Sequence, residues 1–303
     1  WKTFNYAQAN QSKFDRDQAS GHAIQETLAQ DARVYQLPYI SFPEVAPRFN
    51  EGSYGLLRRY LHTHGISWSY GAMRGRESDQ WIRKIESFAM PKRLATLAAS
   101  DFDAVLIERA AYTDGGEAIE TEISNLIGPP TLICPDMSCS LFRLEPSNDS
   151  IASPLLLVVR GSGFRSWTRN EDGRDMTESA GDQPSRLFLL NPLKRREVAR
   201  LGFTISSSSD AMLLAKTDRL TFPRLQLRAG REESFAGTIE LDPGITTLIL
   251  SATPTGTNDS GPRNSNFVLS GVRIDPIDAP EIDQDLRKTD AGSDTIFSSK
   301  ERQ

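Results

Sequence analysis

The sequence predicts an α/β layered domain with a partly parallel sheet over residues 1–148, followed by an antiparallel, jelly-roll-like β-sandwich over residues 149–277. In the first half, amphipathic helix patterns alternate with short apolar runs, which is typical of α/β layers. In the second half, short apolar or alternating runs are separated by Gly, Pro, Asn, Asp and Ser, without helices between them. Apolar residues become few over residues 278–303, which predicts a polar, flexible tail.

The first half contains four helix patterns, and the clearest covers residues 117–127. Ile119, Ile123 and Ile127 form an apolar stripe there, and Gly128 stops the helix. The other helix patterns cover residues 18–30, 54–64 and 78–99, the last of them broken or restarted at Pro91. The expected strands cover residues 32–40, 66–70 and 102–108, and a closing hairpin joins 131–134 to 140–144.

The second half contains short strand patterns with turn residues between them. Asn191-Pro192 and Asp242-Pro243-Gly244 are examples of these turns. The expected strands cover residues 155–160, 186–190, 200–206, 211–216, 220–228, 235–241, 246–252 and 267–274.

The composition is globular but polar, with 38% hydrophobic and 25% charged residues and a formal net charge of -5. Because 35 basic side chains stand against 40 acidic ones, we expect no nucleic-acid partner. The sequence contains no apolar run approaching the roughly 18 residues of a membrane-spanning helix. It begins at Trp1 rather than at Met, so we expect it to be part of a longer product.

Two cysteines, Cys134 and Cys139, occur in the sequence. They cannot form a tetrahedral zinc site alone, and a small disulfide and a pair of reduced thiols are both open. His62 and His64 close a helix pattern, where an offset of two residues points the side chains apart. We expect no metal site and no cofactor.

The strongest ligand-binding pattern is the segment 68–76, which reads Trp-Ser-Tyr-Gly-Ala-Met-Arg-Gly-Arg. It lies in a stretch, residues 54–76, that contains no Asp or Glu although the whole chain is acidic. Aromatic faces stack on sugars, and arginines bind phosphate or carboxylate. The alternative is a buried Trp–Tyr strand followed by a helix start. The candidate ligand-binding residues of this stretch are Arg58, Arg59, Trp68, Tyr70, Arg74 and Arg76.

A second candidate site follows the expected buried strand 102–108. Glu108 ends this strand, and Tyr112 and Asp114 follow it at the edge where α/β proteins bind ligands. Glu108 is therefore a candidate general acid or base for a glycan-cleaving hydrolase, with a second carboxylate nearby. The alternative is that Asp114 begins a turn and caps the next helix, while Glu108 pairs with Arg109 or Arg93. No nucleophile elbow, P-loop or dinucleotide fingerprint occurs.

Five segments of the first half stand out together, at residues 36–44, 60–62, 68–76, 102–109 and 112–116, with a weaker pattern at 241–244. With these segments the chain resembles a soluble block found in large bacterial integral membrane proteins. These proteins carry a multi-span, glycosyltransferase-like membrane part of GT-C type, and some are labelled sugar or phosphoglycerol transferases. The resemblance covers about residues 15–275 and is stronger in the first half.

The resemblance implies an extracytoplasmic location, with attachment to the membrane through sequence outside this chain. It also implies catalytic carboxylates in membrane-side loops absent from this chain, and it assigns no catalytic residue here. This sequence departs from the block in having Cys134 and Cys139, and in reading Asp-Met-Thr-Glu-Ser at 175–179, where an aromatic-rich stretch is expected.

Three functions follow as hypotheses. The first is a domain that positions or binds a glycan, or a lipid-linked phosphosugar acceptor, beside the transmembrane part of the same polypeptide. The second is a hydrolase that uses Glu108, and the third is a structural scaffold packed on membrane spans.

Overall fold

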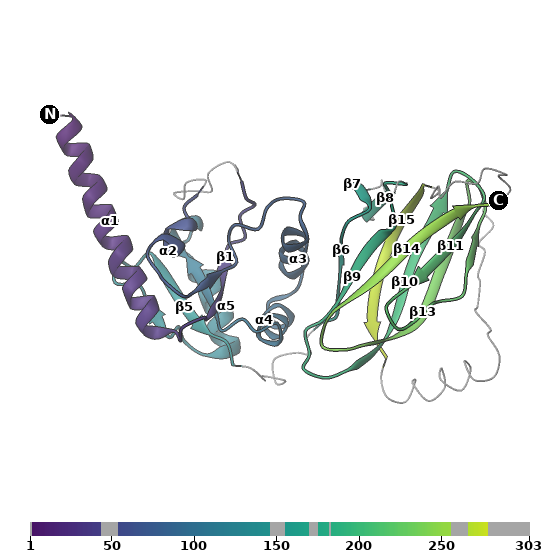
Figure 1. Ribbon diagram of the computed structural model, residues 1–303. Coiled ribbons are helices and arrows are strands. Elements are labelled where there is room, and N and C mark those ends of the chain that lie inside the picture. The colour runs from purple at the N-terminus through teal and green to yellow at the C-terminus, as the bar shows by residue number, and fades with distance from the viewer. Residues whose placement is uncertain are drawn as a thin grey trace. The chain divides into compact units, whose positions relative to one another are not determined.

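The computed structural model describes residues 2–43, 54–145, 155–169, 175–181, 183–255 and 266–277. The chain divides into two compact units, Trp1–Pro154 and Leu155–Gln303 (Figure 1). The predicted boundary at residue 148 and the predicted tail at 278–303 lie outside the described residues.

The first unit contains a five-stranded mixed sheet in the order β2-β1-β3-β5-β4. Strand β1 runs parallel to both β2 and β3, whereas β5 runs antiparallel to β3 and β4. The predicted α/β class with a partly parallel sheet is therefore confirmed. The strands are β1 (Arg33–Leu37), β2 (Ser67–Trp68), β3 (Ala104–Glu108), β4 (Leu132–Ile133) and β5 (Cys139–Arg143).

The helices of the first unit agree best with the prediction where nearby residues such as Gly or Pro mark their ends. Helix α5 has the predicted bounds, and the predicted helix 78–99 is divided into α3 and α4, with Pro91 in the first turn of α4. Helix α1 begins at Lys2 rather than at residue 18, and α2 is shorter than the predicted 54–64. The helices are α1 (Lys2–Thr27), α2 (Leu57–Leu61), α3 (Glu77–Glu86), α4 (Met90–Ala99) and α5 (Glu117–Ile127), with a 3₁₀ turn η1 (Arg109–Ala111).

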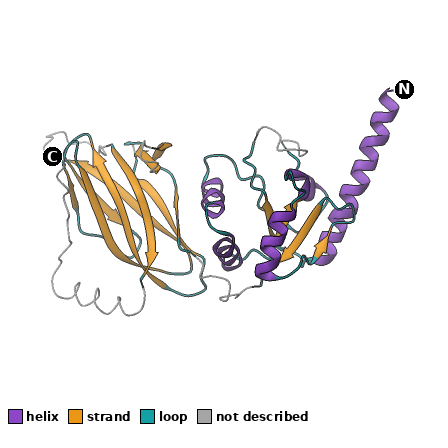
Figure 2. Ribbon diagram, turned by 180° about the vertical axis from the view of Figure 1, so that it is seen from behind, coloured by secondary structure: helices purple, strands orange, loops and turns teal. Residues whose placement is uncertain are grey.

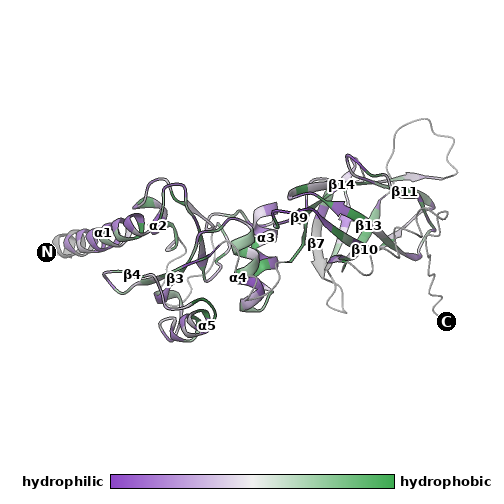
Figure 3. Cartoon of the chain, turned by 90° about the horizontal axis from the view of Figure 1, so that it is seen from below, coloured by the Kyte–Doolittle hydropathy of each residue, from purple (hydrophilic) through white to green (hydrophobic). Residues whose placement is uncertain are grey.

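Helix α1 joins the unit through its C-terminal half and extends away from the sheet beyond it (Figure 1). Ile24 and Leu28 are buried in a cluster with Val34, Leu106 and Leu141 of the sheet. Residues 10–16 are exposed, and the helix is coloured largely as hydrophilic (Figure 3). Among the described residues, no helix combines the length and the apolar character needed to cross a membrane.

Helices α1 and α2 approach each other at Gly21. A Cβ atom at this position would overlap the backbone carbonyl oxygen of His62, directly after α2. Glycine is therefore the residue that allows this close approach.

The second unit is an antiparallel β-sandwich of two five-stranded sheets, as predicted (Figure 2). One sheet has the order β13-β10-β15-β8-β7 and the other the order β12-β11-β14-β9-β6. Alternate residues face inward, as in β9, where Leu187 and Leu189 are buried between less buried neighbours. The strands are β6 (Leu157–Arg160), β7 (Phe164–Arg169), β8 (Asp175–Ser179), β9 (Ser185–Asn191), β10 (Glu197–Ser207), β11 (Ala211–Lys216), β12 (Leu225–Leu227), β13 (Glu232–Leu241), β14 (Gly244–Pro254) and β15 (Phe267–Pro276).

Two parts of the sandwich differ from the strands expected from sequence. The predicted strand 220–228 is shortened to β12, and Pro223, which has no N–H to donate to a ladder, lies in the preceding segment. Strands β7 and β8, which pair with each other, were not among the predicted strands. In β8 the buried residues Thr177 and Ser179 are polar, so the sequence lacks the apolar alternation that predicts a strand.

Candidate functional site

Three neighbouring strands of the first unit end at the same edge of its sheet. Because β2, β1 and β3 run parallel, their last residues Trp68, Leu37 and Glu108 all lie toward this edge. The segments that follow these strands contain most of the candidate residues. This carboxyl edge is where open α/β sheets bind ligands.

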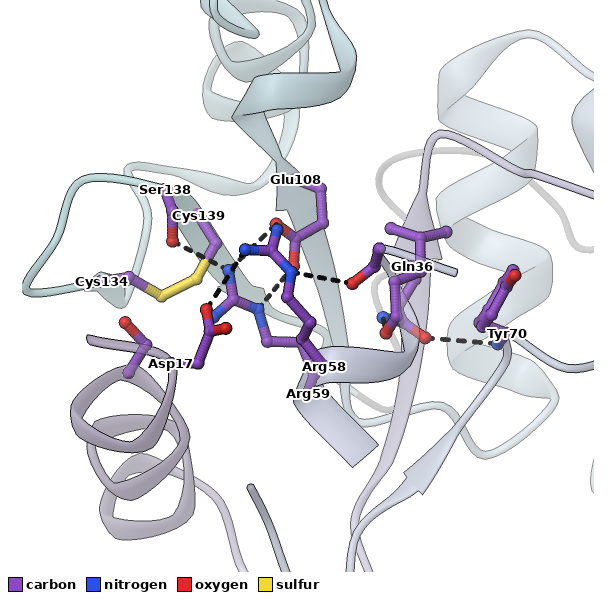
Figure 4. Close-up of polar contacts among 12 residues, drawn as sticks. Asp17, Gln36, Arg58, Arg59, Tyr70, Glu108, Cys134, Ser138 and Cys139 are labelled. Atoms are coloured by element: carbon purple, nitrogen blue, oxygen red, sulfur yellow. Dashed lines mark hydrogen bonds and ion pairs between the residues drawn. A yellow bond between two sulfur atoms is a disulfide. The ribbon is translucent and has the colours of Figure 1, made fainter. Parts of the chain in front are cut away.

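Arg59 is buried beneath this edge, which contradicts its predicted role in ligand binding. Its side chain is 1% exposed and forms a two-pronged ion pair with Glu108, with Nη2 of Arg59 2.9 Å from Oε2 of Glu108 (Figure 4). Nη2 also donates to Oγ of Ser138 at 2.8 Å. Burial by itself lowers the pKa of Arg59, but the charge and hydrogen bonds of Glu108 outweigh burial and raise it. Arg59 is therefore a charged structural residue.

Arg58 also has acidic partners from distant parts of the sequence. Its Nη1 atom lies 3.2 Å from Oδ1 of Asp17 in α1, and its Nη2 atom lies 3.7 Å from Oε2 of Glu108 (Figure 4). Its side chain is 19% exposed. The acid-free stretch of sequence is thus neutralised, at Arg58 and Arg59, by acids that lie outside it.

Glu108 is unsuited to the predicted role of catalytic acid or base. It is 0% exposed, and both of its oxygens bind the Arg59 guanidinium. A general acid or base must reach substrate within hydrogen-bond distance, and this carboxylate does not reach the surface. The structural alternative also named the wrong partners, because Arg109 pairs with Glu120 and Arg93 pairs with Glu86.

Trp68 combines partial exposure with a packing role. Its ring packs against the buried cluster of the first unit, and its Nε1–H donates to Oγ1 of Thr63 at 3.0 Å. Both features agree with the alternative of a strand tryptophan that serves packing.

Tyr70 belongs to a small aromatic cluster at this edge. Its ring lies edge-to-face with Phe42 at 5.9 Å between centroids, and Phe42 meets Tyr54 in the same way at 6.1 Å. The backbone N–H of Tyr70 donates to Oε1 of Gln36 at 3.3 Å (Figure 4). Burial, followed by the neighbouring Tyr54, raises the pKa of Tyr70. Phe42 was missed as a site residue in the sequence, although its place in the segment that follows β1 could have suggested it.

Arg74 and Arg76 lie on the exposed loop between β2 and α3. No ion pair or side-chain hydrogen bond joins either guanidinium to a described residue. Their backbones are held in place, with the N–H of Arg74 donating to the Phe42 carbonyl at 2.8 Å. Gly75 between them has φ +82°, a backbone region that glycine favours. Glu77, also exposed, begins α3 directly after this loop.

Asp114 and Tyr112 lie in the segment between β3 and α5. Asp114 accepts hydrogen bonds from the backbone N–H groups of Ala118 and Gly116, each at 3.0 Å, at the start of α5. These bonds, that of Ala118 first, lower the pKa of Asp114. Asp114 therefore has the helix-capping role weighed as the alternative, and Tyr112 is half-buried between η1 and α5.

A polar hollow of about 440 Å³ opens beside α5. The Arg109–Glu120 ion pair, 2.6 Å between Nε and Oε1, occupies its inner wall. Burial by itself raises the pKa of Glu120, but the hydrogen bonds from Arg109 and Ser140, together with the charge of Arg109, outweigh burial and lower the pKa. The other lining residues are Gly115, Glu117, Thr121, Ser124 and Asn125.

Cys134 and Cys139 form a disulfide that closes the turn between β4 and β5. The turn contributes Asp136, whose Oδ1 accepts from Oγ of Ser20 in α1 at 3.0 Å. It also contributes Ser138, which binds Arg59 in α2 (Figure 4). The closed turn therefore connects two helices to the sheet.

The described residues contain no group of three or more His, Cys, Asp and Glu side chains arranged to hold a metal ion. The His62 ring lies edge-on to Phe14 at 4.9 Å.

No family of known proteins and no curated protein matches this chain. Among solved structures, the chain is similar to a CBM4 module, with 12% identity, a TM-score of 0.27, and coverage of 38% of this chain and 77% of that one. It is similar to the C-terminal CBM6 of LamC from Zobellia galactanivorans, with 11% identity, a TM-score of 0.25, and coverage of 38% and 98%. A third similar structure is the carbohydrate-binding module CBM6cm-2 of Cellvibrio mixtus lichenase 5A in complex with cellotriose, with 13% identity, a TM-score of 0.26, and coverage of 39% and 89%.

These similar structures are carbohydrate-binding modules at low identity and partial coverage. The strand order and the buried core described above establish the sandwich fold of the second unit.

Proposed function

We propose that this chain is a non-catalytic glycan-binding protein, and that the first unit binds a carbohydrate bearing phosphate or carboxylate through Arg74 and Arg76. In this proposal the chain positions an acceptor for a glycosyltransferase-like membrane protein, on the extracytoplasmic side, beside the transmembrane part of the same polypeptide. The segments quoted above, which resemble the soluble block of such proteins, motivate the membrane context.

One observation carries the binding proposal. The guanidinium groups of Arg74 and Arg76 are exposed and form no ion pair with a described residue, and they lie on a loop at the carboxyl edge of the sheet whose backbone is hydrogen-bonded to the Phe42 carbonyl. Arginine forks bind phosphate and carboxylate through paired, charge-assisted hydrogen bonds. Tyr70 and Phe42 lie beside this loop and supply aromatic surface for a sugar ring. Arg58 and Arg59 are excluded from this site, because Asp17 and Glu108 bind them.

The buried Arg59–Glu108 pair weakens the hydrolase alternative, because the carboxylate on which it depended has no access to substrate. The exposure of Arg74 weakens the scaffold alternative, because full burial of Trp68 and Arg74 in internal contacts would have favoured a scaffold. Neither alternative gains an observation that favours it over glycan binding.

Replacing Arg74 and Arg76 together by alanine tests the proposal. Each charge-assisted hydrogen bond contributes about 1.5–3 kcal/mol, and solvent exposure reduces this, so we expect affinity to fall by about tenfold or more. The dependence of affinity on salt should flatten as well, because two charges are removed. Chemical-shift titrations with mannose 6-phosphate and tetragalacturonate provide the measurement, with mannose and maltotetraose as uncharged counterparts.

The matched control replaces Arg33 and Lys92 by alanine. Both are exposed cations of the first unit, and Arg33 begins β1, at the opposite edge of the sheet from the loop. This variant removes the same charge and should bind as the parent does. Equal binding of charged and uncharged sugars, or an equal loss in both variants, would refute the proposed site.

A further inference from the structure

We propose that Asp79 is the positioning residue of the Arg74–Arg76 loop, and that its buried carboxylate anchors the loop backbone from which the two guanidinium groups extend toward a charged glycan. The effect of Asp79 on glycan affinity rests on the proposed function, whereas the anchoring of the loop by Asp79 can be measured without any ligand. Asp79 lies in the first turn of α3 and is 2% exposed.

Three donors from three segments converge on this carboxylate. The backbone N–H of Gly75 donates to Oδ2 at 2.8 Å, and Nε of Arg83 donates to the same oxygen at 3.0 Å. The hydroxyl of Tyr39, from the segment after β1, donates to Oδ1. Asp79 thus joins the loop, its own helix and the segment after β1 at one point.

The same three segments are linked around Asp79 by further contacts. Nη2 of Arg83 donates to Oγ of Ser41 at 2.8 Å, and its guanidinium carbon lies 5.4 Å from the centre of the Tyr39 ring. Phe42 and Met73 form an isolated parallel bridge. The N–H groups of two successive residues, Arg74 and Gly75, are therefore both held, one by the Phe42 carbonyl and one by Asp79.

These contacts fix the backbone of the loop and leave the guanidinium groups of Arg74 and Arg76 exposed. A binding loop needs this arrangement. An ordered loop loses less conformational entropy when a ligand binds, so anchoring increases affinity without a contact to the ligand. A charged acceptor also holds a backbone N–H more strongly than a neutral one. A carboxylate at position 79 therefore suits three converging donors better than an amide does.

The experiment replaces Asp79→Asn in the full chain and measures two quantities. The amide offers one oxygen in place of two and turns its N–H₂ group toward a donor. Exchange of the Gly75 backbone amide, followed by NMR, should accelerate about tenfold or more. Affinity for mannose 6-phosphate and tetragalacturonate should fall by about threefold to tenfold. The salt dependence should keep its parent slope, because Arg74 and Arg76 are still present.

The matched control is Glu86→Gln in the same helix. Glu86 accepts from the Tyr35 hydroxyl at 2.8 Å and pairs with Arg93 at 3.3 Å, and these two partners lie outside the loop. It should lower stability while leaving Gly75 exchange and glycan affinity at parent values. A milder variant, Tyr39→Phe, removes one donor to Asp79 and should accelerate Gly75 exchange by a smaller factor.

The outcomes separate the two proposals. Gly75 exchange at the parent rate in Asp79→Asn, or equal acceleration in Glu86→Gln, overturns the positioning role. Faster Gly75 exchange in Asp79→Asn than in Glu86→Gln supports the anchoring, whatever the sugar titrations give. If the parent protein binds neither charged sugar more tightly than its uncharged counterpart, the proposed function fails while the anchoring of the loop stands.

Discussion

Arg59 and Arg74 come from the same acid-free stretch of sequence, yet their side chains have opposite surroundings. Arg59 is fully buried against Glu108, whereas Arg74 is exposed on the loop after β2. A buried guanidinium needs an acid close to it, because removing a charge from water is unfavourable unless it is paired. Arg59 pairs with Glu108 of β3, and Arg58 pairs with Asp17 of α1. Because both acids lie outside the stretch 54–76, counting the charges within that stretch did not reveal them.

Glu108→Gln tests the structural role assigned to this pair. The substitution leaves the buried charge of Arg59 without its counter-charge, and we expect the free energy of unfolding of the first unit to fall by about 3–5 kcal/mol. Chemical denaturation followed by tryptophan fluorescence measures the change. Glu26→Gln, at an exposed pair 3.4 Å from His22, is the control and should change stability by less than about 0.5 kcal/mol. A small effect of Glu108→Gln would mean that the pair contributes little to the fold.

The sequence allowed the types of residue in the candidate site to be predicted, but not which residues contact one another there. The sequence indicated a short strand at residues 66–70, where the structure has β2, and it indicated that Asp114 could cap a helix. It did not indicate Asp79 or Phe42, because their importance comes from contacts with segments far away in the chain. Residue type and local spacing encode caps and turns, whereas burial of a charge depends on the whole fold.

The turn between β4 and β5 is the element on which two helices of the first unit depend. Its disulfide joins cysteines five positions apart, and Asp136 and Ser138 inside it contact α1 and α2. Burial by itself raises the pKa of Asp136, but the hydrogen bonds from Ser138 and Ser20, together with the charge of Arg59, outweigh burial and lower the pKa. Asp136 is thus held as a charged acceptor for Ser20, and the closed turn orders the docking of both helices.

Replacing Cys134 and Cys139 by alanine removes this closure. For such a short loop, the chain-entropy relation predicts a loss of about 2 kcal/mol in the free energy of unfolding of the first unit. Backbone amides in the C-terminal half of α1 should also exchange faster, because Ser20 loses an ordered partner. Parent protein treated with reductant should behave like the variant. Unchanged exchange in α1 would show that the turn holds its shape without the disulfide.

Element boundaries were predictable where the chain carries its own signals. The apolar stripe of α5 and Gly128 after it gave the bounds of that helix, since both signals are local. In β8 the rule of apolar residues inward failed, because Thr177 and Ser179 are buried and the Ser179 hydroxyl accepts from the N–H of Phe267 at 2.9 Å. A polar residue with an internal partner looks like a loop residue in sequence.

At the scale of the whole molecule, the chain contains two units with separate buried clusters. The cluster of the second unit lies between its two sheets and includes Leu201, Phe203 and Phe235, the last two stacked at 4.4 Å. The first unit has its own cluster around β1, β3 and β5. Fold class was predictable for both units because the change from helix-and-strand alternation to strands alone is a pattern over many residues.

Leu201→Ala should affect the second unit alone. Leu201 is 0% exposed, and truncating a buried leucine costs about 2–5 kcal/mol through lost burial and the cavity that remains. Calorimetry of the full chain should show the transition of the second unit at lower temperature, with that of the first unit unchanged. Ile245→Ala, at a side chain 68% exposed, is the control and should leave both transitions in place. A shift of both transitions by Leu201→Ala would mean that the units unfold together.

The close approach of α1 and α2 at Gly21 has a consequence for the charges beside it. Arg58 and Arg59 sit on α2, and Asp17, the acidic partner of Arg58, sits on α1, about one helical turn before the glycine. Even a methyl group at position 21 would wedge the helices apart and carry both arginines away from Asp17 and Glu108. The absence of a side chain at Gly21 thus allows the ion pairs of Arg58 and Arg59 with Asp17 and Glu108 to form. Substitutions at the exposed residues 10–16 of α1 should not disturb these ion pairs.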